Sequence, residues 1–226
     1  MNTVKIKYHY GSKVPLIPPE STAKIGFIHM PKTGGTFFYA WTRMLSGQIM
    51  YFTHNPARMV TGYNLPLFGL VRNPFDWYVS RYFYFRRCDA VERGVSKSCD
   101  AGLPAGDFAK RFPTFRDHLI WGFDSNLPNF TFTQMYTKMF TLNGKSLMYA
   151  IGKIENMATW VRMICAKHDI RPEITFDDYA NNADNQMYRN KSDHTHYSDY
   201  YDIDMENAVL KQDGVLMSFY NYKMER

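Results

Sequence analysis

The sequence predicts an α/β fold, a single domain with a mostly parallel central sheet flanked by helices. Short apolar runs alternate with longer stretches of helical periodicity, which is the pattern of a parallel sheet covered on both faces. A Gly-rich turn joins the first apolar run to a helical pattern, as in P-loop-like phosphate cradles. A length of 226 residues with 45% hydrophobic residues lies within the range of one domain, here residues 1–226.

The first half of the chain contains three apolar runs that we interpret as strands. Residues 1–22 hold three prolines and are expected to form an irregular lead-in. The elements expected after it are a strand at 24–30, a helix reaching about Leu45, a strand at 48–53, a strand ending at Val71 and a helix from Pro74 to about Arg87. The start of the last helix is marked by Asn73 as N-cap, Pro74 at the first position and Asp76 in the first turn.

The second half is richer in helical patterns. Residues 88–112 contain several Gly and Ser residues and are expected to form a loop excursion, a kind of segment that often serves substrates. The elements expected after it are helices at 113–121 and 130–140, a strand at 146–154, a helix at 155–168, and a helix from about Met205 to Lys211 with a second segment after Gly214. The helix at 155–168 carries an apolar stripe of Met157, Trp160, Val161, Ile164 and Cys165. Residues 144–146 are expected to form a hairpin-like turn, because a strand follows them.

The turn at Pro31–Thr36 has the features of a phosphate cradle. Backbone N–H groups at a helix N-terminus point at an anion, and glycines let the backbone approach it closely. A lysine adds a point charge, and two threonine hydroxyls add donors. The lysine precedes the glycines, unlike in the Walker pattern, which points away from ATP and GTP toward another phosphate-bearing donor. The candidate binding residues of this turn are Lys32, Thr33, Gly34, Gly35 and Thr36.

A second candidate phosphate site begins at Arg72. This arginine follows the strand that ends at Val71, and Ser80 lies about two turns into the next helix, on a face that looks back toward Arg72. A guanidinium fork together with a hydroxyl forms a suitable clamp for a phosphate dianion. Ligands of parallel sheets bind beyond the carboxyl ends of the strands, and Lys32, His54 and Arg72 all follow predicted strands.

These two segments together resemble the PAPS-dependent sulfotransferases, especially the carbohydrate O-sulfotransferase-like group. PAPS is 3′-phosphoadenosine 5′-phosphosulfate. That family has a 5′-phosphosulfate loop of the type PKTGGT and a 3′-phosphate motif of the type R-N-P-x-x-x-x-x-S-R-Y, and both occur here in the family's order. Weaker matches to later family segments are Ile151–Asn156, Asn190–Ser192, Tyr197–Tyr201 and Phe219–Tyr222.

The resemblance implies an enzyme that moves a sulfuryl group from PAPS to an acceptor hydroxyl, here expected on a carbohydrate, and releases adenosine 3′,5′-bisphosphate (PAP). It assigns Lys32 to the donor and to the leaving group, and Arg72 and Ser80 to the 3′-phosphate. Lys191 and Ser192 are expected to add contacts on the 3′-phosphate side. Arg81 either reaches the phosphate or only braces its helix.

His54 is the candidate general base, because the family commonly has a histidine after the strand between the two donor motifs. The rivals are His29, which we expect to support the loop, and Glu155, which we expect to serve as a helix-start residue. No carboxylate cluster for magnesium is visible in the sequence, and we expect no metal.

The net charge of +6 suits a doubly phosphorylated donor, and the basic residues are too scattered to favour nucleic acid. Without an apolar stretch of about eighteen residues or an apolar leader, we expect no membrane segment and a cytoplasmic location. Cys88 and Cys99 bracket a polar loop; they can pair in an oxidising compartment, and they are expected to be free thiols in the cytoplasm. Two other functions stay open: a nucleotide-dependent phosphotransferase, and a non-catalytic nucleotide- or nucleic-acid-binding protein.

Overall fold

The computed structural model describes residues 22–90, 108–182 and 194–226 of the chain. Four parallel strands form its central sheet in the order β2-β1-β3-β6. The strands are β1 (Ile25–His29), β2 (Ile49–Thr53), β3 (Leu67–Val71) and β6 (Ala150–Lys153). The helices are α1 (Gly35–Thr42), α2 (Pro74–Ala90), α3 (Phe108–Arg111), α4 (Phe115–Asp124), α5 (Phe132–Phe140), α6 (Met157–Lys167), α7 (Phe176–Asn181) and α8 (Ile203–Phe219). This single-domain architecture confirms the predicted fold class.

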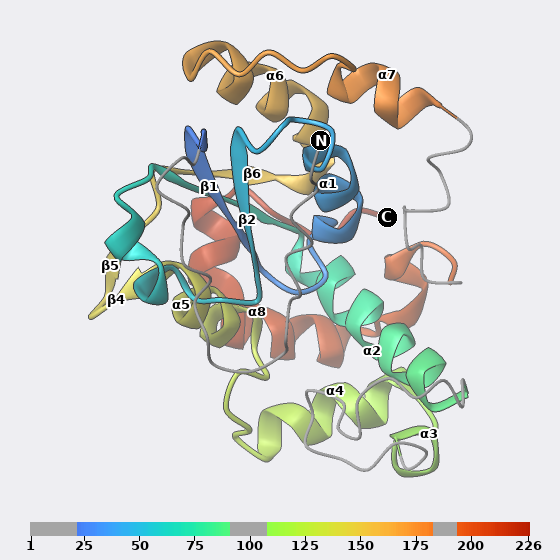
Figure 1. The fold of residues 1–226 in the computed structure, drawn as a ribbon. Helices are drawn as coiled ribbons and strands as arrows, with labels where there is room; N and C mark the ends of the chain where they lie inside the picture. Colours follow the sequence, from blue (N-terminus) through green and yellow to red (C-terminus); the bar gives the residue numbers. More distant parts are fainter. Residues whose placement is uncertain (1–21, 91–107, 183–193) are drawn as a thin grey trace.

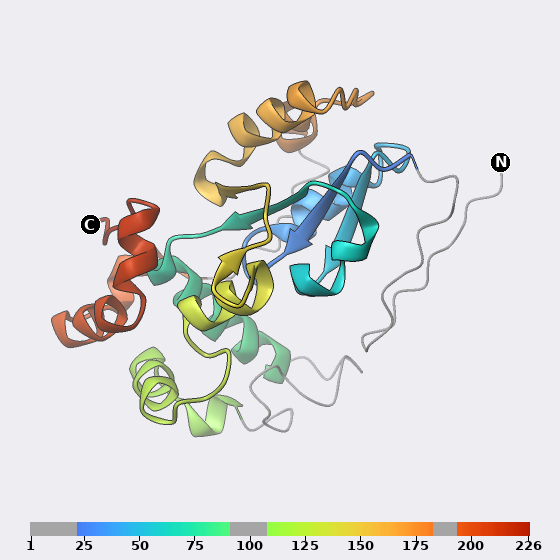
Figure 2. The ribbon, with the colours of Figure 1, turned by 90° about the vertical axis from the view of Figure 1, so that its left-hand side faces the viewer.

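Helices cover both faces of the sheet. Successive side chains of a strand point to opposite faces, so apolar neighbours in one strand pack against helices on different sides. Phe27 packs into a buried cluster with residues of α1, α6 and α7. Its neighbour Ile28 packs into the other cluster, with residues of α2, α4, α5 and α8. The ribbon shows the same three layers, with α6 and α7 on one side of the sheet and α2, α4 and α8 on the other (Figures 1 and 2).

Several predicted elements are confirmed where local chemistry marks them. The helix starts at α4 and α5 each carry a capping box, formed by Thr114 with Asp117 and by Thr131 with Gln134. All five residues of the predicted apolar stripe in α6 are buried. The predicted turn near Gly144 joins the short strands β4 (Thr141–Leu142) and β5 (Lys145–Ser146), which pair as an antiparallel hairpin.

The C-terminal helix differs from the prediction. It does not break near Gly214 but runs without interruption from Ile203 to Phe219. Asp213 holds this point of the helix, because its buried carboxylate accepts hydrogen bonds from the Tyr78 hydroxyl at 2.6 Å and the Thr133 N–H at 2.8 Å. The intrinsic cost of Gly214 in a helix is only about 1 kcal/mol, which these contacts can offset.

Both ends of the loop excursion expected at 88–112 are helical in the described residues. Helix α2 continues to Ala90, and the single turn of α3 occupies Phe108–Arg111. Helix α7 was not predicted, although Thr175 caps it by accepting a hydrogen bond from the Asp178 N–H. Within the described residues, no helix is both long enough and apolar enough to cross a lipid bilayer.

The strand order reverses direction between β1 and β3. From β1 the chain moves outward to β2, then returns past β1 to form β3 on its other side. Such a reversal separates the loops that follow the two strands, and ligands of open α/β sheets bind there. The loops at this point are the predicted phosphate turn after β1 and the segment beginning with Arg72 after β3.

Candidate active site

The turn after β1 is built to present backbone N–H groups. Lys32 and Gly34 have positive φ angles of 68° and 73°, so the chain turns sharply into α1. The φ of Gly34 lies in the left-handed region that favours glycine, and a Cβ atom there would also lie 2.6 Å from Ile154 Cδ1, so that side chain would have to shift. Gly34 is the N-cap of α1 and offers no side chain to it, so the first N–H groups of this helix are left for an anion.

Threonine and tryptophan side chains brace this turn from inside the protein. The buried hydroxyl of Thr33 donates a hydrogen bond to the Met30 carbonyl at 2.7 Å. The indole Nε1–H of Trp77, on α2, donates to the Pro31 carbonyl at 2.8 Å. Both bonds are internal to the fold, so they fix the shape of the cradle. Thr36, by contrast, is exposed at the start of α1.

Arg72 joins the two predicted phosphate sites. Its Nη1 donates to the Lys32 carbonyl oxygen at 3.3 Å, which links the segment after β3 to the turn after β1. Its Nε donates to Asp76 Oδ2 at 2.5 Å, one helical turn along α2. Nη2 takes part in neither bond. The guanidinium is therefore held on two sides, and it lies beside the turn that carries the candidate 5′-phosphate donors.

Two histidines lie at the carboxyl ends of β1 and β2. The His29 ring is only 7% exposed, and its centroid is 4.9 Å from that of His54. Its Nδ1 has no hydrogen-bond partner among the described residues. Burial, and then the charges of His54 and Lys32, lower the pKa of His29 to about 3. His29 is thus a neutral imidazole inside the protein, whereas His54 is partly exposed at the strand end.

The His29 ring packs under the first residue of α1. A Cβ atom on Gly35 would lie 2.0 Å from His29 Cδ2, so the helix start and the ring need a glycine between them. The Lys32 ammonium lies 4.3 Å from the ring centroid of Tyr84 on α2, which is a cation–π contact. The turn, His29 and His54 therefore form one side of the site, and α2 forms the other.

The two other predicted residues on α2 are both buried. Ser80 is 2% exposed, and its role at a phosphate stays a prediction. Arg81 is 7% exposed and donates to the Phe130 carbonyl at 2.6 Å. Its guanidinium also lies over the aromatic ring of Phe130, with 4.9 Å to the centroid. Of the two roles considered for Arg81, these contacts favour bracing the helix.

Glu155 and His54 follow the two outermost strands of the sheet. Glu155 follows β6, and three strand spacings separate β6 from β2, or about 14 Å. Its Oε1 accepts a hydrogen bond from the Asn73 N–H at 2.8 Å, and its Oε2 accepts one from the Tyr222 hydroxyl at 3.0 Å. Both candidates therefore follow strands at the carboxyl edge of the sheet, but Glu155 lies beside the start of α2 and not beside His54.

The remaining predicted residues are only partly covered by the structure. Lys191 and Ser192 lie outside the described residues, as does Cys99. Cys165 is a free, buried cysteine, and burial raises the pKa of its thiol to about 11. In the described part of the chain, no three His, Cys, Asp or Glu side chains gather so as to hold a metal ion.

Three contributors to the site were missed by sequence reasoning. Asp76 was assigned only to the helix dipole, although its i,i+4 spacing from Arg72 is that of an ion pair. Tyr84 carries no local signal for its contact with Lys32. Tyr222 reaches Glu155 from 67 residues further along the chain, a separation that no local pattern reveals.

Comparison with known proteins gives a structural match. The fold superposes on the crystal structure of mouse sulfotransferase SULT7A1 complexed with PAP, with a TM-score of 0.53. The two proteins share 13% sequence identity over 88% of each chain. The fold is that of a sulfotransferase. No family model matches the sequence, and no curated protein matches it either.

Proposed function

We propose that the protein is a PAPS-dependent O-sulfotransferase that transfers a sulfuryl group to a carbohydrate hydroxyl. The observation that carries this proposal is the contact between Arg72 Nη1 and the Lys32 carbonyl oxygen at 3.3 Å. It joins two motifs, 40 residues apart, that resemble the 5′-phosphosulfate loop and the 3′-phosphate motif of sulfotransferases. The match to a sulfotransferase fold supports the same interpretation.

The geometry suits the two charged ends of such a donor. The 5′-phosphosulfate would bind over the turn at Pro31–Thr36, where the α1 N–H groups and the Lys32 ammonium provide positive charge. The 3′-phosphate would bind on the β3 side, at Arg72 and Ser80, with Lys191 and Ser192 contributing there. The net charge of +6 is then explained by the donor, without nucleic acid as a partner.

The reaction is an in-line displacement at sulfur. The acceptor oxygen forms a bond to sulfur while the bond between sulfur and the bridging phosphate oxygen breaks. His54 takes the proton of the acceptor hydroxyl, and Lys32 neutralises the charge that develops on the leaving phosphate. The products are a sulfate ester and PAP. The protein itself supplies the base, the cation and the orientation.

His54 is preferred over its two rivals for geometric reasons. His29 is buried beneath the start of α1, so an acceptor cannot reach it without displacing the turn. Glu155 lies about three strand spacings away, and both of its oxygens already accept hydrogen bonds. Of the three candidates, only His54 is partly exposed and follows β2, a direct neighbour of β1.

A carbohydrate is the proposed acceptor, on the basis of the motif resemblance and of an aromatic content of 17%. Aromatic rings offer flat apolar faces on which sugar rings stack. Tyr84 is the described aromatic residue next to Lys32. We further propose that the protein acts in the cytoplasm.

Calorimetric titration tests the donor assignment. The protein should bind PAP more tightly than adenosine 5′-phosphate or ATP, because only PAP reaches both phosphate sites. Arg72→Ala should weaken PAP binding by at least about tenfold, as expected for a charge-assisted hydrogen bond. Arg162→Ala is the matched control, because Arg162 pairs with Asp177 on an exposed surface away from the site.

Two outcomes would overturn the proposal. Tighter binding of ATP than of PAP would favour a phosphotransferase. PAP binding with no transfer of ³⁵S from labelled PAPS to any member of a saccharide, phenol and amine panel would favour a non-catalytic binding protein. Transfer to a phenol or amine alone would retain the sulfotransferase and remove the carbohydrate.

A further inference from the structure

A hydrogen-bond network ties the start of α2 to the last residues of the chain. Glu155 lies at its centre and accepts from the Asn73 N–H at 2.8 Å and from the Tyr222 hydroxyl at 3.0 Å. Asn73 also reaches this segment directly, since its Nδ2 donates to the Lys223 carbonyl at 2.8 Å. One carboxylate thus bonds both to the backbone beside Arg72 and to the C-terminal segment.

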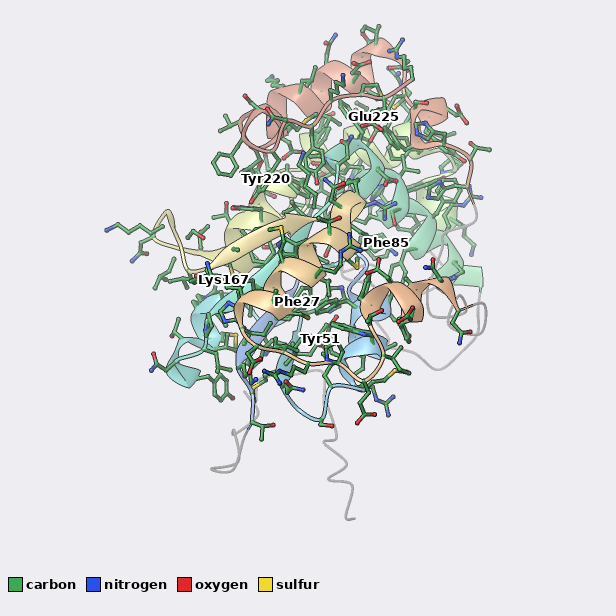
Figure 3. All side chains as sticks on the ribbon, turned by 90° about the horizontal axis from the view of Figure 1, so that it is seen from above. Phe27, Tyr51, Phe85, Lys167, Tyr220 and Glu225 are labelled. Carbon is green, nitrogen blue, oxygen red and sulfur yellow. The ribbon has the colours of Figure 1, made fainter. Side chains whose placement is uncertain are left out.

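Tyr197 closes the network from a third element. Its hydroxyl accepts a hydrogen bond from Asn73 Nδ2 at 3.2 Å and another from the Glu225 N–H at 3.1 Å. Glu225 and Tyr220 lie beyond one edge of the sheet, away from Tyr51 of β2 (Figure 3). The network therefore belongs to the 3′-phosphate side of the proposed site and is remote from the candidate base.

The electrostatics of Tyr222 agree with this arrangement. Burial raises the pKa of its hydroxyl, and the charge of Glu155 raises it further, so the hydroxyl stays a hydrogen-bond donor. The charge of Arg72 acts in the opposite direction on the same pKa, as the smallest of the causes. The Lys153 ammonium lies 4.6 Å from the centroid of the Tyr222 ring.

We propose that Glu155 is a positioning residue for the 3′-phosphate end of the donor. By holding the Asn73 N–H and the Tyr222 hydroxyl, it fixes the junction between β3 and α2 from which Arg72 projects. The inference rests on the proposed function. It predicts that the network sets the preference for PAP over adenosine 5′-phosphate, because small displacements of a clamp residue cost much of its binding.

The path from Glu155 to the clamp is short. Asn73 is the next residue after Arg72, and its side-chain Oδ1 accepts from the Phe75 N–H at 3.2 Å to cap α2. Loss of the Glu155 bond would free the backbone at this cap. Arg72 bonds to Asp76 on α2 and to the Lys32 carbonyl in the turn after β1, so a shift of α2 relative to that turn would displace its guanidinium.

The test is the ratio of dissociation constants for adenosine 5′-phosphate and PAP, measured by calorimetry in wild type and variants. Tyr222→Phe removes one hydroxyl from the network and should lower this ratio by about threefold to tenfold, the range for one hydrogen bond. Glu155→Gln should lower it similarly, because a neutral amide makes weaker hydrogen bonds than the carboxylate, and its nitrogen can only donate to the Tyr222 hydroxyl. The double variant should be no worse than the stronger single variant.

Tyr220→Phe is the matched control. Its hydroxyl pairs with the Tyr136 hydroxyl at 3.1 Å, in the same segment but away from Glu155, so the ratio should stay at the wild-type value. In activity assays, Tyr222→Phe should raise KM for PAPS and leave kcat near wild type.

The outcomes distinguish the 3′-phosphate assignment from the proposed role of Glu155. A wild-type protein with no preference for PAP would overturn the 3′-phosphate assignment itself, and the inference with it. A wild-type preference that persists in Tyr222→Phe and Glu155→Gln would overturn only the role of Glu155, even if the melting temperatures fall. A loss of kcat with unchanged donor binding in Glu155→Gln would instead make Glu155 a participant in the chemistry.

Discussion

Replacing His54 tests the proposed chemistry most directly, and the backbone decides which replacement is clean. His54 has a φ angle of 56°, in the left-handed region. A residue with an ordinary side chain costs roughly 1–2 kcal/mol there, whereas asparagine adopts this conformation readily. His54→Asn therefore removes the imidazole and keeps the turn, whereas His54→Ala adds strain to the loss of the base.

The expected loss of kcat follows from the usual contribution of a general base, and the expected PAP affinity follows from the geometry. A positioned base contributes about 10² to 10⁴ in rate, so kcat of His54→Asn should fall by that factor. PAP affinity should stay within about twofold, because the two proposed phosphate sites follow β1 and β3 while His54 follows β2. A defect in kcat without a defect in product binding distinguishes a base from a donor-binding residue.

The assay is the initial rate of ³⁵S transfer from saturating PAPS to the acceptor found in the panel. Glu155→Gln is the comparison, because it changes a carboxylate about three strand spacings away. The assignment is wrong if His54→Asn keeps more than about a tenth of wild-type kcat. It is also wrong if His54→Asn and Glu155→Gln lose kcat equally.

Three further variants address the turn and the core. Lys32→Asn, chosen because Lys32 also has a positive φ of 68°, should lower kcat by about 10² to 10³, whereas a change confined to KM would make Lys32 a binding residue only. Gly35→Ala should destabilise the fold by about 1–3 kcal/mol and abolish PAP binding, because the new Cβ would lie 2.0 Å from the His29 ring. The control is Gly214→Ala, which should not destabilise the fold because an added Cβ meets open space there. Burial, and then a neighbouring arginine charge, lower the pKa of His118 to about 3. As the pH falls below about 6.5, this histidine is protonated in the unfolded chain but not in the folded protein, so the folded state loses stability until about pH 3. When the pH is lowered from 7.5 to 5.0, the free energy of unfolding measured by urea titration should therefore fall by about 2 kcal/mol less in His118→Leu than in wild type.

The sheet and the outline of the site were predictable because their signals are local. Each strand is a short apolar run, and the residue that follows it falls at the same edge of the sheet whatever the strand order. Lys32, His54 and Arg72 could therefore be assigned to one edge before the order β2-β1-β3-β6 was known. The capping boxes at Thr114 and Thr131 are local in the same way, although the prediction placed these helix starts at residues 113 and 130 without using them.

The parts that escaped prediction depend on contacts between distant segments. The continuity of α8 past Gly214 comes from Asp213, whose partners Tyr78 and Thr133 lie 135 and 80 residues away. Glu155 was interpreted as a helix-start residue, because nothing near it in the sequence indicates Asn73 or Tyr222 as partners. Local patterns report propensity and periodicity, but they do not report which buried polar groups meet after folding.

The strand order also determines the side from which an acceptor approaches under the proposed function. The phosphate turn after β1 lies between His54 on the β2 side and Arg72 on the β3 side. A donor with its 3′-phosphate at Arg72 and its phosphosulfate over the turn presents sulfur toward β2. In-line displacement places the attacking oxygen opposite the leaving oxygen, so the acceptor enters on the β2 side. Acceptor selectivity should therefore reside in the segment that follows β2, whereas the Glu155 network on the β6 side acts on the donor alone.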